Sequence, residues 1–484
     1  MIRPLRRISF AVLMLLVLLL VNLNYLQAIR AEELNERPGN SRVLLREYDR
    51  ERGPIVVGTT AVARSTETDD TLRYLRRYPS GPLYAHATGY YSFVYGSEGV
   101  ERTADEALAG TDERFLVRRV IDAGGGGSSR QGGSVALTLN PRAQAAAAEG
   151  LRGRRGAVVA LDPATGAILA MASSPSYDPN PLASHDRDEV TSAWKRLNDD
   201  AAQPLLNRAV RQTYPPGSTF KLVTAAAALS TGRYTPGSEL PGPRLLRLPD
   251  TRVDLPNFNR QACAPDRPTV TMEFALQRSC NTTFAALGLE VGDDALREQA
   301  ERFGFGRELS VPTPAAVSRF PDDPNPPQTA LSSIGQFDVR STPLQMAMVT
   351  AGIANGGEVM RPYLVSQVLA PDLSPVDTTR PDVLSRAVSP QVAAQLTQMM
   401  VSVTEQGTAT NGRIPGVRVG GKTGTAQHAE GRPPHAWFVS FTPAESPRVA
   451  VAVVIEEGGG AQEVTGNRLA APVARAVMEA VLRS

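Results

Sequence analysis

A charge-free apolar run from Ile8 to Leu23 restricts the possible structure of this chain more than any other segment does. Inside a membrane, a helix satisfies the backbone hydrogen-bonding groups of such a single run. About 20 apolar residues span a bilayer, so the run is long enough if Tyr25 and Leu26 lie at the outer interface. A cleaved signal peptide is the alternative, although Leu26-Gln27-Ala28 is a weak cleavage site. We expect residues 1–30 to be a cytoplasmic tail and retained anchor of a single-pass cell-membrane protein, with the rest extracytoplasmic.

The remaining chain is long enough for two domains with ordinary cores. Apolar residues make up 42% of the sequence, and the formal net charge of +2 gives no reason to expect a nucleic-acid partner. Residues 31 to about 122 mix short apolar runs with turn signals and show no catalytic pattern, and residues 31–150 are expected to form a small accessory domain. Within it, the glycine- and serine-rich stretch Ala123–Ser134 is expected to be a flexible linker or a hairpin tip.

Two pairs of β-prone segments enclose a helical middle in residues 151–484. Runs around the turn Pro163–Gly166 predict one hairpin, and runs flanking Pro443–Pro447 predict another. Helices are expected over Leu222–Leu229, Pro343–Ala354, Pro390–Glu405 and Ala470–Leu482. Since strands from both ends must meet around the helices, the pattern indicates an α+β domain.

The first chemically suggestive motif is Ser218-Thr219-Phe220-Lys221, just before the alanine-rich helix. Positions i and i+3 share a helix face, so the Lys221 amine can reach the Ser218 hydroxyl. A serine hydroxyl needs a base to become a good nucleophile, and a desolvated lysine can be that base. We therefore predict Ser218 as the nucleophile and Lys221 as its general base. Alone, the motif also fits an ordinary exposed helix start.

The second motif is Ser279-Cys280-Asn281, which falls between two expected helices. The Ser279 hydroxyl can relay protons, and the Asn281 amide can hold both a substrate carbonyl and the lysine. The ordinary alternative is a helix N-cap.

The third motif is Lys422-Thr423-Gly424-Thr425, ahead of a predicted strand. It fits an edge strand on which Gly424 lets a ligand approach the backbone while Lys422 and Thr425 face a substrate carboxylate. The ordinary alternative is a glycine-rich hairpin.

Lysine usage favours the chemical interpretation of these motifs. Of 51 basic residues only Lys195, Lys221 and Lys422 are lysines. Arginine cannot lose its proton in a protein, so a lysine at 221 makes sense where a neutral amine is needed, with burial and the charge of Lys422 lowering its pKa. The alternative is chance retention of a few lysines.

The three motifs in this order resemble the signature of the penicillin-recognising serine acyltransferases. The resemblance is to class B penicillin-binding proteins of high-GC Gram-positive bacteria, and it covers most of residues 155–484. Segments that carry it are RGAVVALDPATGAILAMASSPSYDPN, NRAVRQTYPPGSTFK, STPLQMAMVTAGIANGG, VGGKTGTAQ and HAWFVSFTP, while GYYSFVYGSEGVERTADEALAG is similar to the N-terminal module of the class.

This resemblance implies a fold and a domain plan. Residues 151–484 would form a transpeptidase domain with an antiparallel sheet, helices on both of its faces and an all-helical subdomain. Residues 31–150 would form an accessory domain of the dimerisation or pedestal kind.

The resemblance also implies a reaction. A peptidoglycan stem peptide ending in D-Ala-D-Ala would acylate Ser218 and then pass to an amine of a neighbouring stem, and β-lactams would block the enzyme. The oxyanion would lie between the N–H groups of Ser218 and Thr425, with Thr423 and Gly424 also binding substrate. No cofactor or metal is implied. Glycan polymerisation would belong to a partner, which we expect to be an integral-membrane polymerase.

Three other functions fit the same motifs. A D,D-carboxypeptidase would use water instead of an amine, and a β-lactam sensor or hydrolase shares the fold, although we find no segment resembling the deacylating glutamate loop of class A hydrolases. A non-catalytic cell-wall scaffold is the third, against which the intact Ser218, Lys221, Ser279 and Lys422 argue.

The chain has two cysteines, Cys263 and Cys280, and an exported chain can pair them. With its neighbours facing the cleft, Cys280 is expected to point away from the cleft toward the loop that holds Cys263. The alternative is two separate buried thiols.

Overall fold

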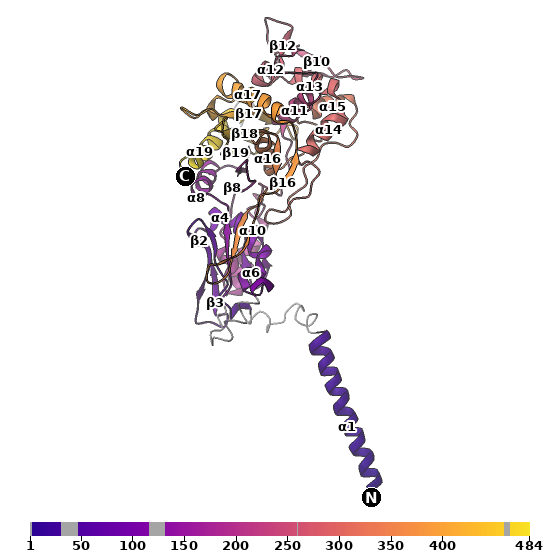
Figure 1. Ribbon diagram of the computed structural model, residues 1–484, viewed down its shortest axis with the longest axis vertical. Coiled ribbons are helices and arrows are strands. Elements are labelled where there is room, and N and C mark those ends of the chain that lie inside the picture. Colours follow the sequence, from indigo (N-terminus) through magenta and orange to yellow (C-terminus); the bar gives the residue numbers. More distant parts are fainter. Residues whose placement is uncertain (1, 31–46, 116–130, 259, 459–464) are drawn as a thin grey trace.

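The computed structural model describes residues 2–30, 47–115, 131–258, 260–458 and 465–484. Figure 1 shows three parts along the longest axis: the N-terminal helix, a middle part and a larger head. Most of the predicted glycine-rich linker, residues 123–130, lies outside the described residues, as does the chain from 31 to 46.

The N-terminal helix α1 spans Ile2–Asn24 and continues as a π-helical turn over Tyr25–Ile29. Its segment Arg6–Gln27 is long and apolar enough to cross a membrane, and no part of that segment is buried against the protein. The structure thus agrees with an N-terminal membrane anchor.

A six-stranded sheet organises the middle part, in the order β15-β14-β6-β1-β2-β3. The strands are β1 Ile55–Val57, β2 Thr60–Glu67, β3 Tyr74–Arg77, β6 Ser134–Leu137, β14 Val365–Leu369 and β15 Pro375–Thr378. The β1–β6 pair is parallel and the other pairs are antiparallel. Strands β14 and β15 come more than 200 residues after β6, and elements of the head lie between them in the sequence. The sheet therefore pairs strands from two distant parts of the chain.

Short helices pack beside this sheet: α4 Gly81–Thr88, α5 Gly99–Thr103 and α6 Asp105–Ala109. Glu101 of α5 is fully buried and bridges Arg52 and Arg76 at 2.7 and 2.6 Å. A buried carboxylate is tolerated only when it is paired in this way. The pairing fixes α5 to the strands.

The head is built on a five-stranded antiparallel sheet, in the order β17-β18-β19-β7-β8. Its strands are β7 Gly156–Leu161, β8 Ile168–Ser174, β17 Gly420–Ala426, β18 His435–Thr442 and β19 Val449–Ile455. Every residue of β18 and β19 is buried, so helices must cover both faces. The two predicted hairpins are confirmed, and β7 and β19 pair as the meeting of first and last strands requires.

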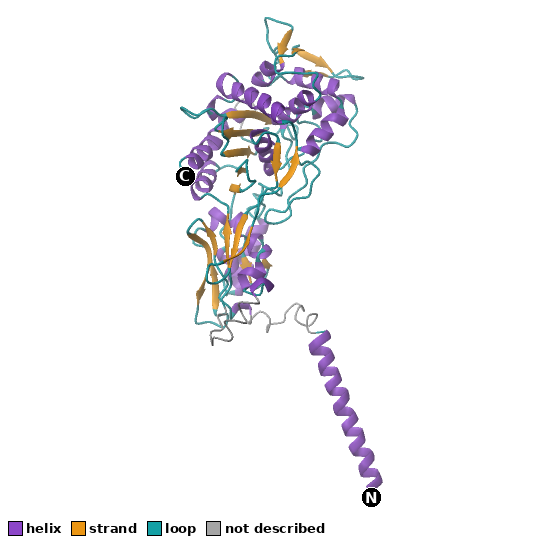
Figure 2. Cartoon of the chain, viewed as in Figure 1, coloured by secondary structure: helices purple, strands orange, loops and turns teal. Residues whose placement is uncertain are grey.

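Two helix groups cover this sheet (Figure 2). Helices α8 Pro141–Gly150 and α19 Ala471–Leu482 pack together against it, and α16 Pro343–Ala354 packs against β7, β18 and β19. Helix α17, Pro390–Gln406, packs against β17. The helices predicted in these three C-terminal regions are confirmed, and so is the α+β fold class.

A helical subdomain lies beside β17 at the far end of the head (Figure 1). Its helices are α11 Lys221–Ser230, α12 Met272–Arg278, α13 Asn281–Val291, α14 Asp293–Arg302 and α15 Pro326–Ser332. Between α11 and α12 the chain forms two small pairs, β9 Glu239–Pro241 with β12 Thr269–Thr271, and β10 Leu245–Arg247 with β11 Asp254–Pro256. The remaining elements are β4 Tyr91–Ser92, β5 Gly96–Ser97, α9 Asn180–Ala183, α10 Arg187–Asp199, β13 Glu358–Met360, β16 Val383–Arg386, α18 Gly466–Leu469 and the 3₁₀ turns Glu113–Phe115, Gly217–Thr219 and Thr410–Gly412.

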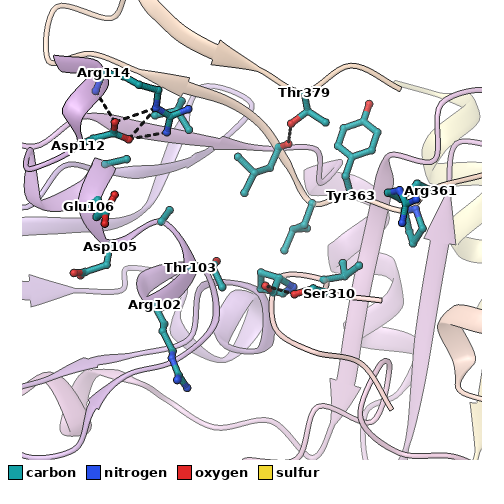
Figure 3. Close-up of a pocket in the computed structure, with 18 residues that line it drawn as sticks. Arg102, Thr103, Asp105, Glu106, Asp112, Arg114, Ser310, Arg361, Tyr363 and Thr379 are labelled. Carbon is teal, nitrogen blue, oxygen red and sulfur yellow. Dashed lines mark hydrogen bonds and ion pairs between the residues drawn. The ribbon is translucent and has the colours of Figure 1, made fainter. Parts of the chain in front are cut away.

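A groove of about 780 Å³ separates α5 and α6 from the segment 310–312 and from the segment 361–365, which leads from the head into β14. Figure 3 shows Asp105 and Glu106 on one side of it and Tyr363 on the other. At one end, Arg114 pairs with Asp112 and with Asp377 of β15, each at 2.6 Å.

Candidate active site

Ser218 lies in the 3₁₀ turn Gly217–Thr219, and α11 begins three residues later at Lys221. The turn is held by the loop after α15, because Gly217 donates its N–H to the Gly335 carbonyl at 2.9 Å. Ser218 is partly exposed at the cleft, and within the described part of the chain its hydroxyl makes no hydrogen bond. The predicted nucleophile therefore precedes the helix on a tight turn and does not open the helix itself.

Lys221 is fully buried at the start of α11. Its Nζ donates to the Ser279 carbonyl and to Asn281 Oδ1, both at 2.7 Å, and lies 3.4 Å from Ser279 Oγ. Burial, and then the nearby charge of Lys422, hold the pKa of Lys221 well below its usual value. A neutral amine has two hydrogens and one lone pair, so two carbonyl-type acceptors leave the lone pair free to accept a proton.

Ser279 stands between the two lysines. It ends α12 with a left-handed backbone, φ +60°, and its Oγ accepts a hydrogen bond from Lys422 Nζ at 2.8 Å. Lys422 is also fully buried, and burial lowers its pKa to about 7. The Ser279 hydroxyl thus sits where it can carry a proton between two amines.

Strand β17 brings the third motif to the same place, as the edge strand of the sheet. Gly424 lies close to the turn of Ser218, since a Cβ at Gly424 would be 3.0 Å from Thr219 Cγ2. The Thr423 hydroxyl is 2.8 Å from that of Thr408, which follows α17. Thr425 continues along the strand and faces the cleft.

The three motifs converge on one cleft of about 500 Å³. Ser218, Ser279, Asn281, Thr423, Gly424 and Thr425 line it, while Lys221 and Lys422 lie beneath the lining. The arrangement brings together a serine hydroxyl, two buried amines, a second hydroxyl between these amines, and an edge strand along which an extended peptide could lie.

Cys263 and Cys280 form a disulfide in the structure, with Cα atoms 5.6 Å apart. Both cysteines line the cleft, so the bond is part of its wall instead of lying away from it. Cys280 reaches the loop that holds Cys263, as expected, and this loop itself borders the cleft.

Several lining residues carry no sequence signal. Asn257, Gln336, Thr408 and Asn467 reach the cleft from four separate loops or helix ends. Each resembles an ordinary polar loop residue in the sequence, and only the folded chain brings it to the site. No group of three or more metal-ligating side chains is found among the described residues.

Comparison with known families agrees with this geometry. Residues 156–479 match the penicillin-binding protein transpeptidase domain, and residues 52–135 match the penicillin-binding protein A dimerisation domain. The chain is a class B penicillin-binding protein.

Relatives of this penicillin-binding protein span its whole length. It is 47% identical to the peptidoglycan D,D-transpeptidase PbpA of Mycolicibacterium smegmatis and to that of Mycobacterium tuberculosis, over 99% of each chain. The ceftriaxone acyl-enzyme complex of penicillin-binding protein A from M. tuberculosis superposes with a TM-score of 0.87 at 46% identity, covering 90% of this chain and 100% of that one. A crystal structure of the same M. tuberculosis protein gives 0.86 at 45% identity, with the same coverage.

Proposed function

We propose that this penicillin-binding protein is a peptidoglycan D,D-transpeptidase that cross-links stem peptides through an acyl-enzyme at Ser218 and is inhibited by β-lactams. The observation that carries the proposal is the buried Lys221, whose hydrogen bonds to Ser279 and Asn281 suit a neutral amine beside a serine on a tight turn. The named activity of the mycobacterial relatives supports it.

In the proposed acylation, Lys221 takes the proton of the Ser218 hydroxyl as its oxygen attacks the carbonyl between two D-alanines. The tetrahedral oxyanion lies between the N–H groups of Ser218 and Thr425. Ser279, hydrogen-bonded to Lys422, gives its hydroxyl proton to the leaving amine and takes up the proton that Lys221 accepted from Ser218, so D-alanine departs and Lys221 is neutral again. The peptide is then an ester of Ser218.

Deacylation regenerates the enzyme when an amine of a neighbouring stem attacks the ester. Before acylation the donor peptide lies along β17, where Thr423, Gly424 and Thr425 contact its backbone and Lys422 attracts the terminal carboxylate that later leaves with D-alanine. A hydrolase or carboxypeptidase would need an activated water instead. The described lining of the cleft contains no carboxylate to activate one, which favours slow hydrolysis and transfer to an amine.

The test is covalent labelling of the extracytoplasmic part with a penicillin. Intact mass should show one adduct per chain that is absent in Ser218→Ala and present in Ser230→Ala, a control at the far end of α11. An adduct that persists in Ser218→Ala, or one hydrolysed within seconds, would contradict the proposal. Adding D-amino acids to the acyl-enzyme of a stem-peptide thioester separates transfer to amines from hydrolysis by water.

The domain plan and membrane arrangement extend this proposal. We propose a tail and anchor in residues 1–30, an accessory domain in 31–150 and the transpeptidase domain in 151–484, with all but the tail outside the cytoplasm. The apolar helix α1 supports the anchor, and the two matched families support the other domains. We propose an integral-membrane glycan polymerase as partner, which α1, the candidate span among the described residues, could contact in the bilayer.

A further inference from the structure

Asn257 is a buried polar residue at the cleft that none of the three motifs includes. It is 6% exposed and lies on the loop after β11. Its Oδ1 accepts hydrogen bonds from the backbone N–H groups of Asn281 at 2.7 Å and Thr282 at 3.1 Å. These are the first two N–H groups of α13.

Helix α13 needs this acceptor, because the first N–H groups of a helix have no partner within it. Its own N-cap residue, Cys280, makes no side-chain capping bond. Asn257 supplies the missing acceptor from 24 residues earlier. It is anchored in turn, since its Nδ2 donates to the carbonyls of Pro243 at 3.2 Å and Gln261 at 2.9 Å.

The residue that Asn257 holds is one of the two acceptors of Lys221. Asn281 is the first residue of α13, and its Oδ1 accepts from Lys221 Nζ at 2.7 Å. A displaced helix start would move this oxygen and free one hydrogen of the amine, so the lone pair would lose its fixed direction. Misplacement of reacting groups by about 1 Å can lower a rate about a hundredfold.

We propose that Asn257 is a positioning residue for acylation, which acts by capping α13 from outside and so fixes Asn281 against the Lys221 amine. The proposal rests on the proposed function, in which Lys221 is the base for Ser218.

The test compares Asn257→Ala with Asn140→Ala in the whole extracytoplasmic part. Asn140 is a matched control, because it accepts from two N–H groups at the start of α8, both at 3.0 Å, away from the cleft. Both variants should lose about 2 °C of Tm through the lost cap. Only Asn257→Ala should react slowly with a fluorescent penicillin, at an acylation rate about a hundredfold below that of the parent protein.

The pH profile separates positioning from simple loss of stability. The Asn281 oxygen stabilises the ammonium form of Lys221, so its displacement should move the acid limb of the acylation profile to lower pH. Asn257→Asp keeps the acceptor and loses the amide donors, and should recover most of the rate. If Asn257→Ala does not fold, the acylation rate of Asn257→Asp alone tests the inference.

Acylation at the parent rate in Asn257→Ala, an acid limb that stays or moves to higher pH, or equal slowing in Asn140→Ala would each overturn the inference. So would an Asn257→Asp variant as slow as Asn257→Ala. Failure of the proposed function is distinguishable, because the parent protein itself would then carry no adduct at Ser218.

Discussion

Lys221 and Lys422 are both fully buried and both contact the Ser279 hydroxyl. Their different surroundings nevertheless favour different chemical roles. Lys221 donates to two carbonyl-type acceptors, and burial followed by the charge of Lys422 holds its pKa well below the usual value, while burial alone lowers the pKa of Lys422 to about 7. Lys221 is therefore the proposed base, and Lys422 is still protonated in a large share of molecules at neutral pH. This difference can be tested by substitution.

Replacing Lys221 with arginine should place a permanent cation at this position and abolish the base, because arginine does not release its proton. We expect acylation by penicillin to fall at least about a hundredfold in Lys221→Arg, the lower end for general-base catalysis. Lys422→Arg should be milder, since a guanidinium still binds a carboxylate. Lys195→Arg, on the exposed face of α10, should change nothing. Equal losses of acylation rate in Lys221→Arg and Lys422→Arg would contradict the proposed division of roles.

The lowered pKa of Lys422 also predicts how stability depends on pH. Between about pH 7 and 10.5 the unfolded chain keeps the proton of this lysine and the folded chain has lost it. The free energy of unfolding therefore gains a contribution that rises with pH across this window and is flat below it. Denaturant unfolding from pH 6 to 10 should show a smaller rise in Lys422→Met than in the parent. Parallel curves for the two proteins would contradict the prediction.

At the scale of elements, the turn of Ser218 depends on its contact with the loop after α15. A Cβ at Gly335 would lie 2.2 Å from the Gly217 carbonyl oxygen, and the backbone there has φ +72°. Gly335→Ala should displace the turn and lower acylation about a hundredfold.

Gly232→Ala is the matched control for this substitution. Gly232 has the same φ of +72°, but a Cβ there would meet nothing within 4 Å. It should lose about 1 kcal/mol of stability through backbone strain and keep the parent acylation rate. If both variants acylate equally fast, the contact at Gly335 does not position the nucleophile.

The sequence predicted elements well where the signal is local. The strands of the head are continuous apolar runs, and the predicted helix Pro343–Ala354 is α16, which has proline at its first position and Thr342 as its N-cap. It did not predict β14, whose partner β6 lies more than 200 residues earlier, because a short half-buried strand has no periodicity of its own. The motifs located the chemistry, but the role of Asn257 depends on a contact between separate loops.

At the scale of the whole molecule, the six-stranded sheet makes the middle part depend on the C-terminal half. Val368 of β14 pairs with Val135 of β6. A chain that starts at residue 151 keeps β14 and β15 and loses β6, which exposes an unpaired, partly apolar edge. We expect it to aggregate or to unfold at a lower temperature than a chain that starts at residue 47. Size-exclusion chromatography and thermal unfolding of both would test this, and equal behaviour would show that the pairing contributes little.

The same sheet has a mechanical consequence. The chain leaves the middle part after β6, returns to it for β14 and β15, and leaves it again before β16, so three connections join the head to the middle part. A body on one connection can turn in any direction, whereas three connections at separate points restrict its rotation about every axis. The groove between α6 and Tyr363 borders one of these connections, the segment 361–365 that leads into β14 (Figure 3). We therefore expect the cleft of Ser218 to keep a nearly constant orientation relative to the middle part.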